Sequence, residues 1–189
     1  MLKKLFDDVR FGGKITIRHK RNGKEIRGWQ EWPFLHFFRK HFGYNFPKIF
    51  GLTGYWRFGV TYRNLVVTAG KGLITGRING VGSPAAPTAM AIGIGTVAPD
   101  AANTTLGSEI TTNGGGRGAG TATTQTTTVT NDTARLVKSW TFTGGFAVTE
   151  MGILNDATSG GTLLVRNVFS AYNVVSGDTF EITHNLKNA

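Results

Sequence analysis

Two consecutive apolar runs joined by a short polar loop constrain the fold of this chain more than any other feature. The runs are Phe146–Asn155 (FAVTEMGILN) and Gly161–Ser170 (GTLLVRNVFS), and the loop is Asp156–Gly160 (DATSG). Apolar runs of this length, bounded by turn-forming residues, predict a β-hairpin. An isolated hairpin is not stable in water, so these two strands must belong to a larger sheet.

Other segments supply the rest of that sheet. Strand-like patterns recur at spacings of roughly 8–12 residues, as in antiparallel sandwiches and barrels. They cover Val60–Val67, Ala89–Gly95, Ala119–Thr130, Ala134–Thr143 and Thr179–Leu186. One short helix is expected over Thr68–Asn79, with Thr68 as its N-cap. Because strands do not alternate with long helices, the pattern predicts a mainly β fold: an antiparallel, jelly-roll-like β-sandwich with one short helix.

The charge is distributed unevenly along the chain. Residues 1–63 contain 14 Lys/Arg and 4 Asp/Glu, whereas residues 64–189 contain seven of each. The first part also holds 15 of the 21 aromatic residues. This difference in composition predicts two parts: a basic, aromatic N-terminal arm over residues 1–63 and a β-sandwich domain over residues 64–189.

The arm has two predicted elements of its own. Gly13–Trp29 contains Asn22-Gly23, the strongest short hairpin signal, and is expected to form a small basic hairpin. It is too polar to have its own core, so it must lie on another part of the molecule. Trp32–Phe42 is expected to be a short helix, since Pro33 suits a first helical turn and Gly43 suits a helix end.

The basic and aromatic side chains of the arm are the expected partner-binding surface, because aromatic residues and Arg are typical anchors of protein interfaces. The candidates are Arg18, Lys20, Arg21, Lys24, Arg27, Trp29, Trp32, Phe37, Phe38, Arg39, Lys40 and Trp56. The same composition is compatible with nucleic-acid binding, with contact to a membrane surface, or with a small aromatic core.

No pattern in the sequence indicates catalytic residues. The chain has no cysteine, which excludes disulfides and thiolate metal sites. No pair of acids has a spacing that suggests a general acid and base, and we expect neither an enzyme nor a bound cofactor or metal. Glu150, in the middle of an apolar run, is expected to form a structural pair with Arg166 on the neighbouring strand. No apolar run reaches about 18 residues, so we expect no transmembrane segment.

Several motifs taken together resemble a family of tailed-phage virion proteins, over about residues 64–182. They are AIGIGT, TTLGSEI, NDTARLVKSWTF, FAVTEMGIL and GTLLVRNVFSAYNVVSGDTFEIT. The pair VTEMGIL and GTLLVR is also similar to strand pairs in the N-terminal attachment regions of some phage tail fibres. The resemblance does not extend to residues 1–63.

The resemblance implies a structural role in a bacteriophage virion that is assembled in the cytoplasm of the bacterial host, and it implies no catalytic residues. Our first expectation is a capsid decoration (cement) protein that is clamped to the shell by its arm. The alternatives are a tail, neck or fibre-attachment protein, a vertex or spike protein, and a nucleic-acid-binding packaging protein. The expected partners are other virion proteins and further copies of the chain, with a trimer as the expected oligomer.

Overall fold

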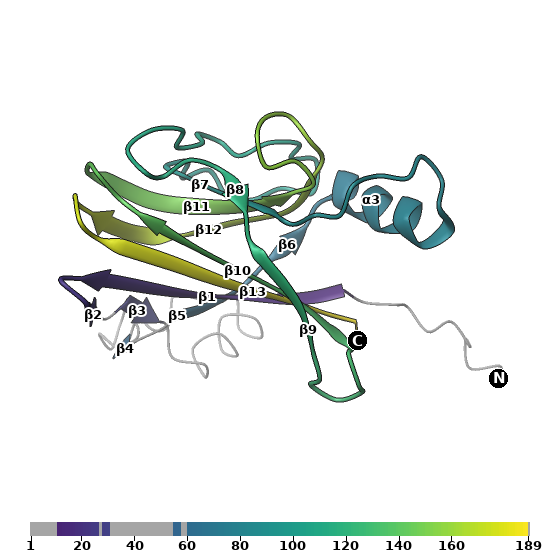
Figure 1. Cartoon of the computed structure of the whole chain (residues 1–189), viewed down its shortest axis with the longest axis horizontal. Helices are drawn as coiled ribbons and strands as arrows, with labels where there is room; N and C mark the ends of the chain where they lie inside the picture. The colour runs from purple at the N-terminus through teal and green to yellow at the C-terminus, as the bar shows by residue number, and fades with distance from the viewer. Residues whose placement is uncertain (1–10, 27, 31–54, 58–59, 189) are drawn as a thin grey trace, which may run out of the picture.

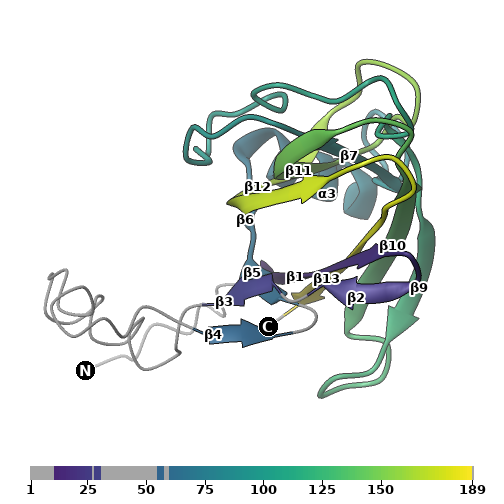
Figure 2. The same cartoon turned by 90° about the vertical axis from the view of Figure 1, so that its left-hand side faces the viewer.

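The structure is a computed structural model that describes residues 11–26, 28–30, 55–57 and 60–188. The helix expected over Trp32–Phe42 lies outside these residues. Within them, no helix has the length and apolar character needed to cross a membrane. The chain folds mainly into β-strands, which form two stacked layers (Figures 1 and 2).

The first layer, called sheet I here, has six strands in the order β2-β1-β13-β10-β9, with β5 also paired to β1. These strands are β1 (Phe11–Arg21), β2 (Lys24–Ile26), β5 (Val60–Arg63), β9 (Thr121–Gln125), β10 (Thr133–Thr141) and β13 (Thr179–Asn188). All its pairings are antiparallel. Apolar residues alternate with polar ones along β1, β10 and β13, as expected for a sheet with one buried face.

The second layer, sheet II, has five strands in the order β6-β12-β11-β7-β8. They are β6 (Leu65–Val66), β7 (Ala89–Gly93), β8 (Gly118–Ala119), β11 (Phe146–Leu154) and β12 (Leu163–Val174). The predicted central hairpin is confirmed as β11 and β12. A separate short ladder joins β3 (Gly28–Gln30) to β4 (Tyr55–Arg57).

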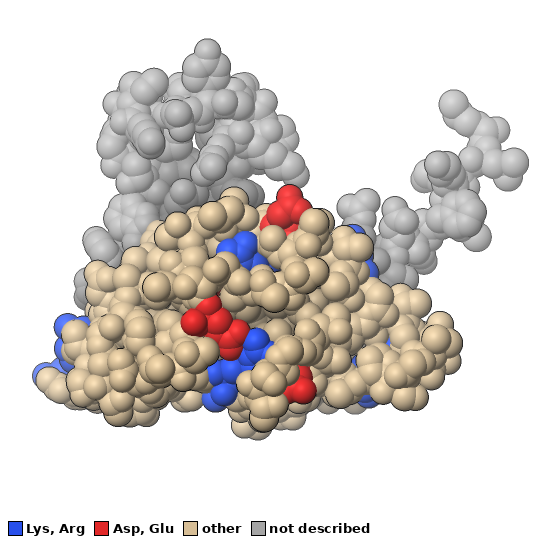
Figure 3. Space-filling view, turned by 90° about the horizontal axis from the view of Figure 1, so that it is seen from above, with Lys and Arg blue, Asp and Glu red and all other residues tan. Residues whose placement is uncertain are grey.

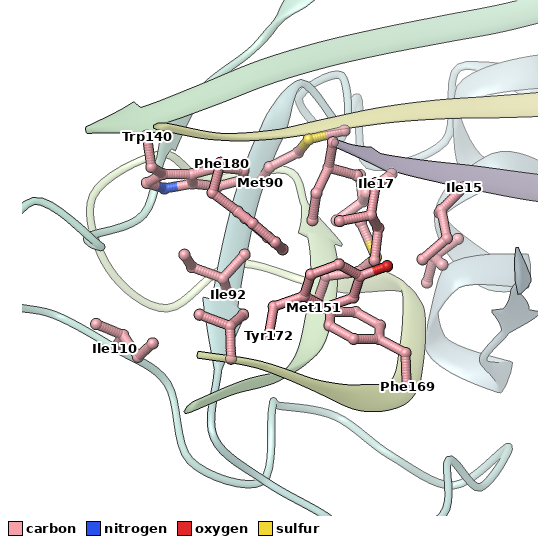
Figure 4. Packing of buried hydrophobic residues seen from close by; sticks show 14 of the residues in the cluster. Ile15, Ile17, Met90, Ile92, Ile110, Trp140, Met151, Phe169, Tyr172 and Phe180 are labelled. Carbon is pink, nitrogen blue, oxygen red and sulfur yellow. The ribbon is translucent and has the colours of Figure 1, made fainter. Parts of the chain in front are cut away.

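The core fills the space between the two sheets. Ile15, Ile17 and Phe180 from sheet I face Met90 and Met151 from sheet II, and each of these side chains is at most 1% exposed. Figure 4 shows these residues and their aromatic neighbours pointing toward one another from both layers. Two facing antiparallel sheets with a shared apolar interior confirm the predicted β-sandwich.

The division expected at Arg63 cuts across sheet I. Strand β1 pairs along its whole length with β13, from Phe11 opposite Asn188 to Lys20 opposite Thr179. Its inward side chains belong to the main core, and β5 lies beside it. Residues 11–21 and 60–63 are therefore part of the sandwich rather than of a separate arm. The charge count placed the boundary at Arg63 because the outward side chains of β1 are basic. Its inward side chains are apolar and belong to the core, which a charge count does not reveal.

The hairpin predicted within Gly13–Trp29 is present as β1 and β2. Asn22 and Gly23 form its turn with φ angles of 51° and 74°, the left-handed values that a type I′ turn requires. The hairpin was expected to lie on another part of the molecule; instead its first strand is built into sheet I and contributes Ile15 and Ile17 to the main core.

The predicted helix is α3 (Thr68–Asn79), which ends at Gly80 in the left-handed conformation. Its N-cap is Val67 rather than Thr68, and no side chain caps it. Instead, the backbone N–H of Thr68 donates to the carbonyl of Ala101, so a tertiary contact replaces the expected cap.

Candidate functional site

The carboxylate of Glu150 on β11 is fully buried and lies on sheet II. Gly152 lies opposite Arg166 on β12, which makes Glu150 a diagonal neighbour of Arg166 on the outer face of sheet II. Gly152 leaves this face open, and Leu106 from the connection between β7 and β8 packs over it. The Glu150 and Arg166 side chains are 0% and 3% exposed.

Five N–H groups donate to this carboxylate. The Arg166 guanidinium donates from Nε at 3.0 Å and from Nη2 at 2.8 Å. Backbone N–H groups of Gly95, Gly107 and Ser108 donate at 3.0, 3.0 and 2.7 Å. All three belong to residues 94–117, the connection that covers sheet II and is called the 94–117 loop here. The structure thus brings Glu150 and Arg166 together and makes them the anchor of this loop.

The backbone must come very close to make these bonds. A Cβ atom on Gly95 would overlap Oε1 of Glu150, and one on Gly93 would lie 2.6 Å from it. Glycine at these positions therefore lets the loop reach the carboxylate. Arg166 extends the anchor, because its Nη1 donates to the side-chain oxygen of Asn103 at 2.9 Å.

The buried Glu150–Arg166 pair, with its hydrogen bonds to the 94–117 loop, is called the clamp here, because it holds this loop on sheet II. Burial alone would raise the pKa of the Glu150 carboxyl, but the N–H donors of Gly107 and Ser108 and the Arg166 guanidinium outweigh burial and lower this pKa. A carboxylate that already accepts five hydrogen bonds has no lone pair directed at a substrate. The clamp fixes the 94–117 loop, and Figure 3 shows that the surface on this side is mostly uncharged, with few basic and acidic residues interspersed.

A second buried carboxylate ties β1 to the turn before β13. Asp178 accepts hydrogen bonds from His19 Nε2 at 2.7 Å, from Arg21 Nε at 2.9 Å and from the Val175 N–H at 3.0 Å. The Arg21 guanidinium, followed by His19, holds the pKa of the Asp178 carboxyl well below its usual range in spite of burial. No local sequence pattern indicates this cluster, because His19 and Asp178 lie almost 160 residues apart.

An apolar groove of about 450 Å³ opens between the sheets near β9. Its lining includes Ala122, Ala134, Leu136, Ile153, Leu164 and Leu186. His184 also lines it, with Nε2 at 2.6 Å from the side-chain amide of Asn64, and burial lowers the pKa of this imidazole to about 3. Such a groove can receive apolar side chains. Its described lining contains no pair of groups suited to acid–base chemistry.

The predicted partner-binding residues fall into three groups. Arg18, Lys20, Arg21 and Lys24 lie together on the β1–β2 hairpin, where Arg21 is engaged by Asp178. Trp29 and Trp56 occupy opposite positions in the β3–β4 ladder. The others lie outside the described residues: Arg27, Trp32, Phe37, Phe38, Arg39 and Lys40.

Comparison with known proteins gives one family. A family model described as "Podophage GP4 fiber I protein gp80" matches residues 71–186, more than half of the chain. No curated protein and no solved structure matches. The matched residues run from α3 to β13 and contain the central hairpin, the 94–117 loop and the clamp, but not β1.

This match confirms the resemblance to tailed-phage virion proteins that the motifs indicated. The chain is therefore a virion structural protein of the fibre type, and its partners are other virion proteins. The chain belongs to the Podophage GP4 fiber I protein gp80 family.

Proposed function

We propose that this chain is a subunit of a virion fibre, attached to other virion proteins through its basic N-terminal region and displaying its sandwich on the particle. The observation that carries the proposal is the family match over residues 71–186. The clamped 94–117 loop supports it, because a loop fixed by three backbone hydrogen bonds to a buried ion pair suits a surface that must keep its shape outside the cell.

The proposed role is structural and needs neither catalysis nor a cofactor. Within the described residues, no group of three or more His, Asp or Glu side chains is placed to hold a metal ion. The two histidines of this part, His19 and His184, are buried and hydrogen-bonded. The carboxylate of Glu150 is bonded to Arg166 in the clamp, and the carboxylate of Asp178 is bonded to His19 and Arg21 of β1.

We also propose that the subunit works as a homo-oligomer, with a trimer as the specific expectation, since closed symmetric assembly is the rule for repeated structural subunits. Light scattering during size-exclusion chromatography measures the mass directly. Three times the chain mass of 20.4 kDa is the expected result, and a monomer at micromolar concentration would contradict it.

Electron microscopy of purified virions tests where in the particle this chain lies. The chain would carry a small C-terminal tag that binds gold-labelled antibody, and an untagged virus serves as the control. We expect a few gold particles per virion, all at fibres. Many regularly spaced copies over the shell would instead show capsid decoration, and gold confined to the neck would show an attachment protein.

A further inference from the structure

The outer face of sheet I carries a cluster of cations with no carboxylate partner in the described part of the chain, and it offers a second contact surface. Alternation along β1 directs Ile15, Ile17 and His19 into the core. The intervening residues Lys14 and Arg18 therefore lie on the solvent side, where both are exposed.

Strand register brings cations from four strands close together. Lys14 on β1 lies opposite Arg63 on β5 and opposite Asn185 on β13. Asn185 in turn lies opposite Arg135 on β10. Since strands lie about 4.8 Å apart, the row from Arg63 to Arg135 spans about 14 Å. Lys187, two residues beyond Asn185 on β13, lies on the same face.

The carboxylates of this face serve other residues. Glu25 lies 3.8 Å from Arg18, and Glu181 accepts a hydrogen bond from Ser139 at 3.2 Å. Among the described residues, no carboxylate forms a salt bridge with Lys14, Arg63, Arg135 or Lys187. These four residues are called the basic row here.

The basic row is expected to lower the folding stability of the protein when no partner is bound. Like charges directly opposite each other on neighbouring strands, as Lys14 and Arg63 are, destabilise a sheet. In addition, Nε of Arg135 is buried without a hydrogen-bond partner in the described part of the chain. An anionic partner would remove the repulsion and supply acceptors for the solvent-exposed N–H groups of the guanidinium groups.

We propose that the basic row docks onto an acidic surface of a neighbouring virion protein. The inference rests on the proposed function for the existence of that neighbour, and it names the surface and the charge that recognise it. A protein is favoured over a nucleic acid because the positions between the cations hold Asn185 and threonines, and no aromatic residue of the row is available to stack on bases.

The experiment compares two variants with the same change of charge. The chain is supplied in trans to a phage that lacks its gene, and copies per purified virion are counted by quantitative mass spectrometry. Lys14→Glu/Arg135→Glu reverses the basic row. Lys71→Glu/Arg77→Glu makes the equal change on α3, which packs on sheet II. We expect incorporation to fall at least about tenfold for the first variant and to stay unchanged for the second.

Other outcomes separate the possible explanations. Equal incorporation of both variants and the wild type would overturn the inference, while leaving the fibre proposal intact. Absence of the wild type from virions would defeat the fibre proposal and the inference together. If Lys14→Glu/Arg135→Glu fails to give the wild-type melting transition, then Lys14→Gln/Arg135→Gln takes its place, with the same expected direction.

Fluorescence anisotropy with a 30-base-pair DNA duplex and with poly-L-glutamate identifies the class of anion. We expect binding to poly-L-glutamate that weakens with salt and is lost in the basic-row variant. Tight duplex binding that is lost in the same variant, without binding to poly-L-glutamate, would assign the surface to nucleic acid and overturn the protein-docking inference.

Discussion

The outer face of sheet I carries Lys14 and Arg135, which have no acidic partner among the described residues, whereas the outer face of sheet II is covered by the 94–117 loop and holds its charges, Glu150 and Arg166, in a buried pair. The sheets have similar antiparallel architecture, so the difference lies in the partners that their charges have. Charge that is buried and fully hydrogen-bonded fixes a loop. Charge that is exposed and unbalanced is free to bind another molecule.

The largest effect should follow from removing residues 1–63. If this segment were a separable arm, a compact β module would remain. Because β1 and β5 belong to sheet I and Ile15 and Ile17 to the core, we expect the truncated chain to lose its cooperative thermal transition. Ile17→Ala in the full chain provides a graded control, with an expected loss of about 2–5 kcal/mol. A truncated protein that melts cooperatively would show that sheet II is stable without β1.

Breaking the clamp on sheet II should cost about 3–5 kcal/mol of unfolding free energy for either Glu150→Ala or Arg166→Ala, because each change leaves a buried charge unpaired. Urea denaturation measures this loss. The double variant should lose much less than the sum of the two single losses. The matched control on sheet I is Glu181→Ala, where the expected change is within about 0.5 kcal/mol. Additive losses for Glu150 and Arg166 would show that the two side chains act independently.

Two glycines of α3 test how closely this helix packs on sheet II. A Cβ on Gly70 would lie 2.7 Å from Cα of Leu164, whereas a Cβ on Gly72 would meet nothing within 4 Å. We expect Gly70→Ala to destabilise the protein by about 1–3 kcal/mol. Gly72→Ala should stabilise it by about 0.5–1 kcal/mol, since alanine is the better helix former. Equal effects of the two substitutions in thermal melts would contradict this packing.

Lowering the pH should reduce the stability of the fold through one buried group of sheet I, the imidazole of His184. The imidazole of His184 has its pKa lowered from 6.5 to about 3, so the unfolded chain binds a proton there at a higher pH than the folded chain does. Stability is therefore full above about pH 6.5 and falls as the pH drops toward 3, by about 2 kcal/mol between pH 7 and pH 5. His184→Gln should remove this part of the pH dependence. An unchanged slope in that variant would assign the acid sensitivity to other groups.

The smallest effect is expected at the basic row. Lys14→Gln removes one of two like charges that lie opposite each other, so unfolding free energy should stay the same or rise by up to about 0.5 kcal/mol. Any gain should shrink at 1 M salt, where such repulsion is screened. Lys71→Gln on α3 is the matched control. A loss above about 1 kcal/mol for Lys14→Gln would show that the row contributes to the fold itself, and not to recognition.

Local patterns were sufficient for the elements and their class. Alternation of apolar residues located β10 and β13, and Asn22-Gly23 located the turn between β1 and β2. The helix from Thr68 to Asn79 was predicted with its bounds, but its N-terminal contact was not. The carbonyl that binds the Thr68 N–H comes from Ala101, more than 30 residues away, and no local pattern specifies such a contact.

The sequence by itself determined that this chain forms an antiparallel β-sandwich that contains the β11–β12 hairpin, and its motifs indicated a structural protein of a tailed-phage virion. Only the tertiary structure decided that β1 belongs to the sandwich, that Asp178 binds His19 and Arg21, and that Glu150 anchors the 94–117 loop. The physical reason is that alternation and turn chemistry act over a few residues, whereas strand register and the partners of buried charges are set by chain segments that meet only when the sheets pack.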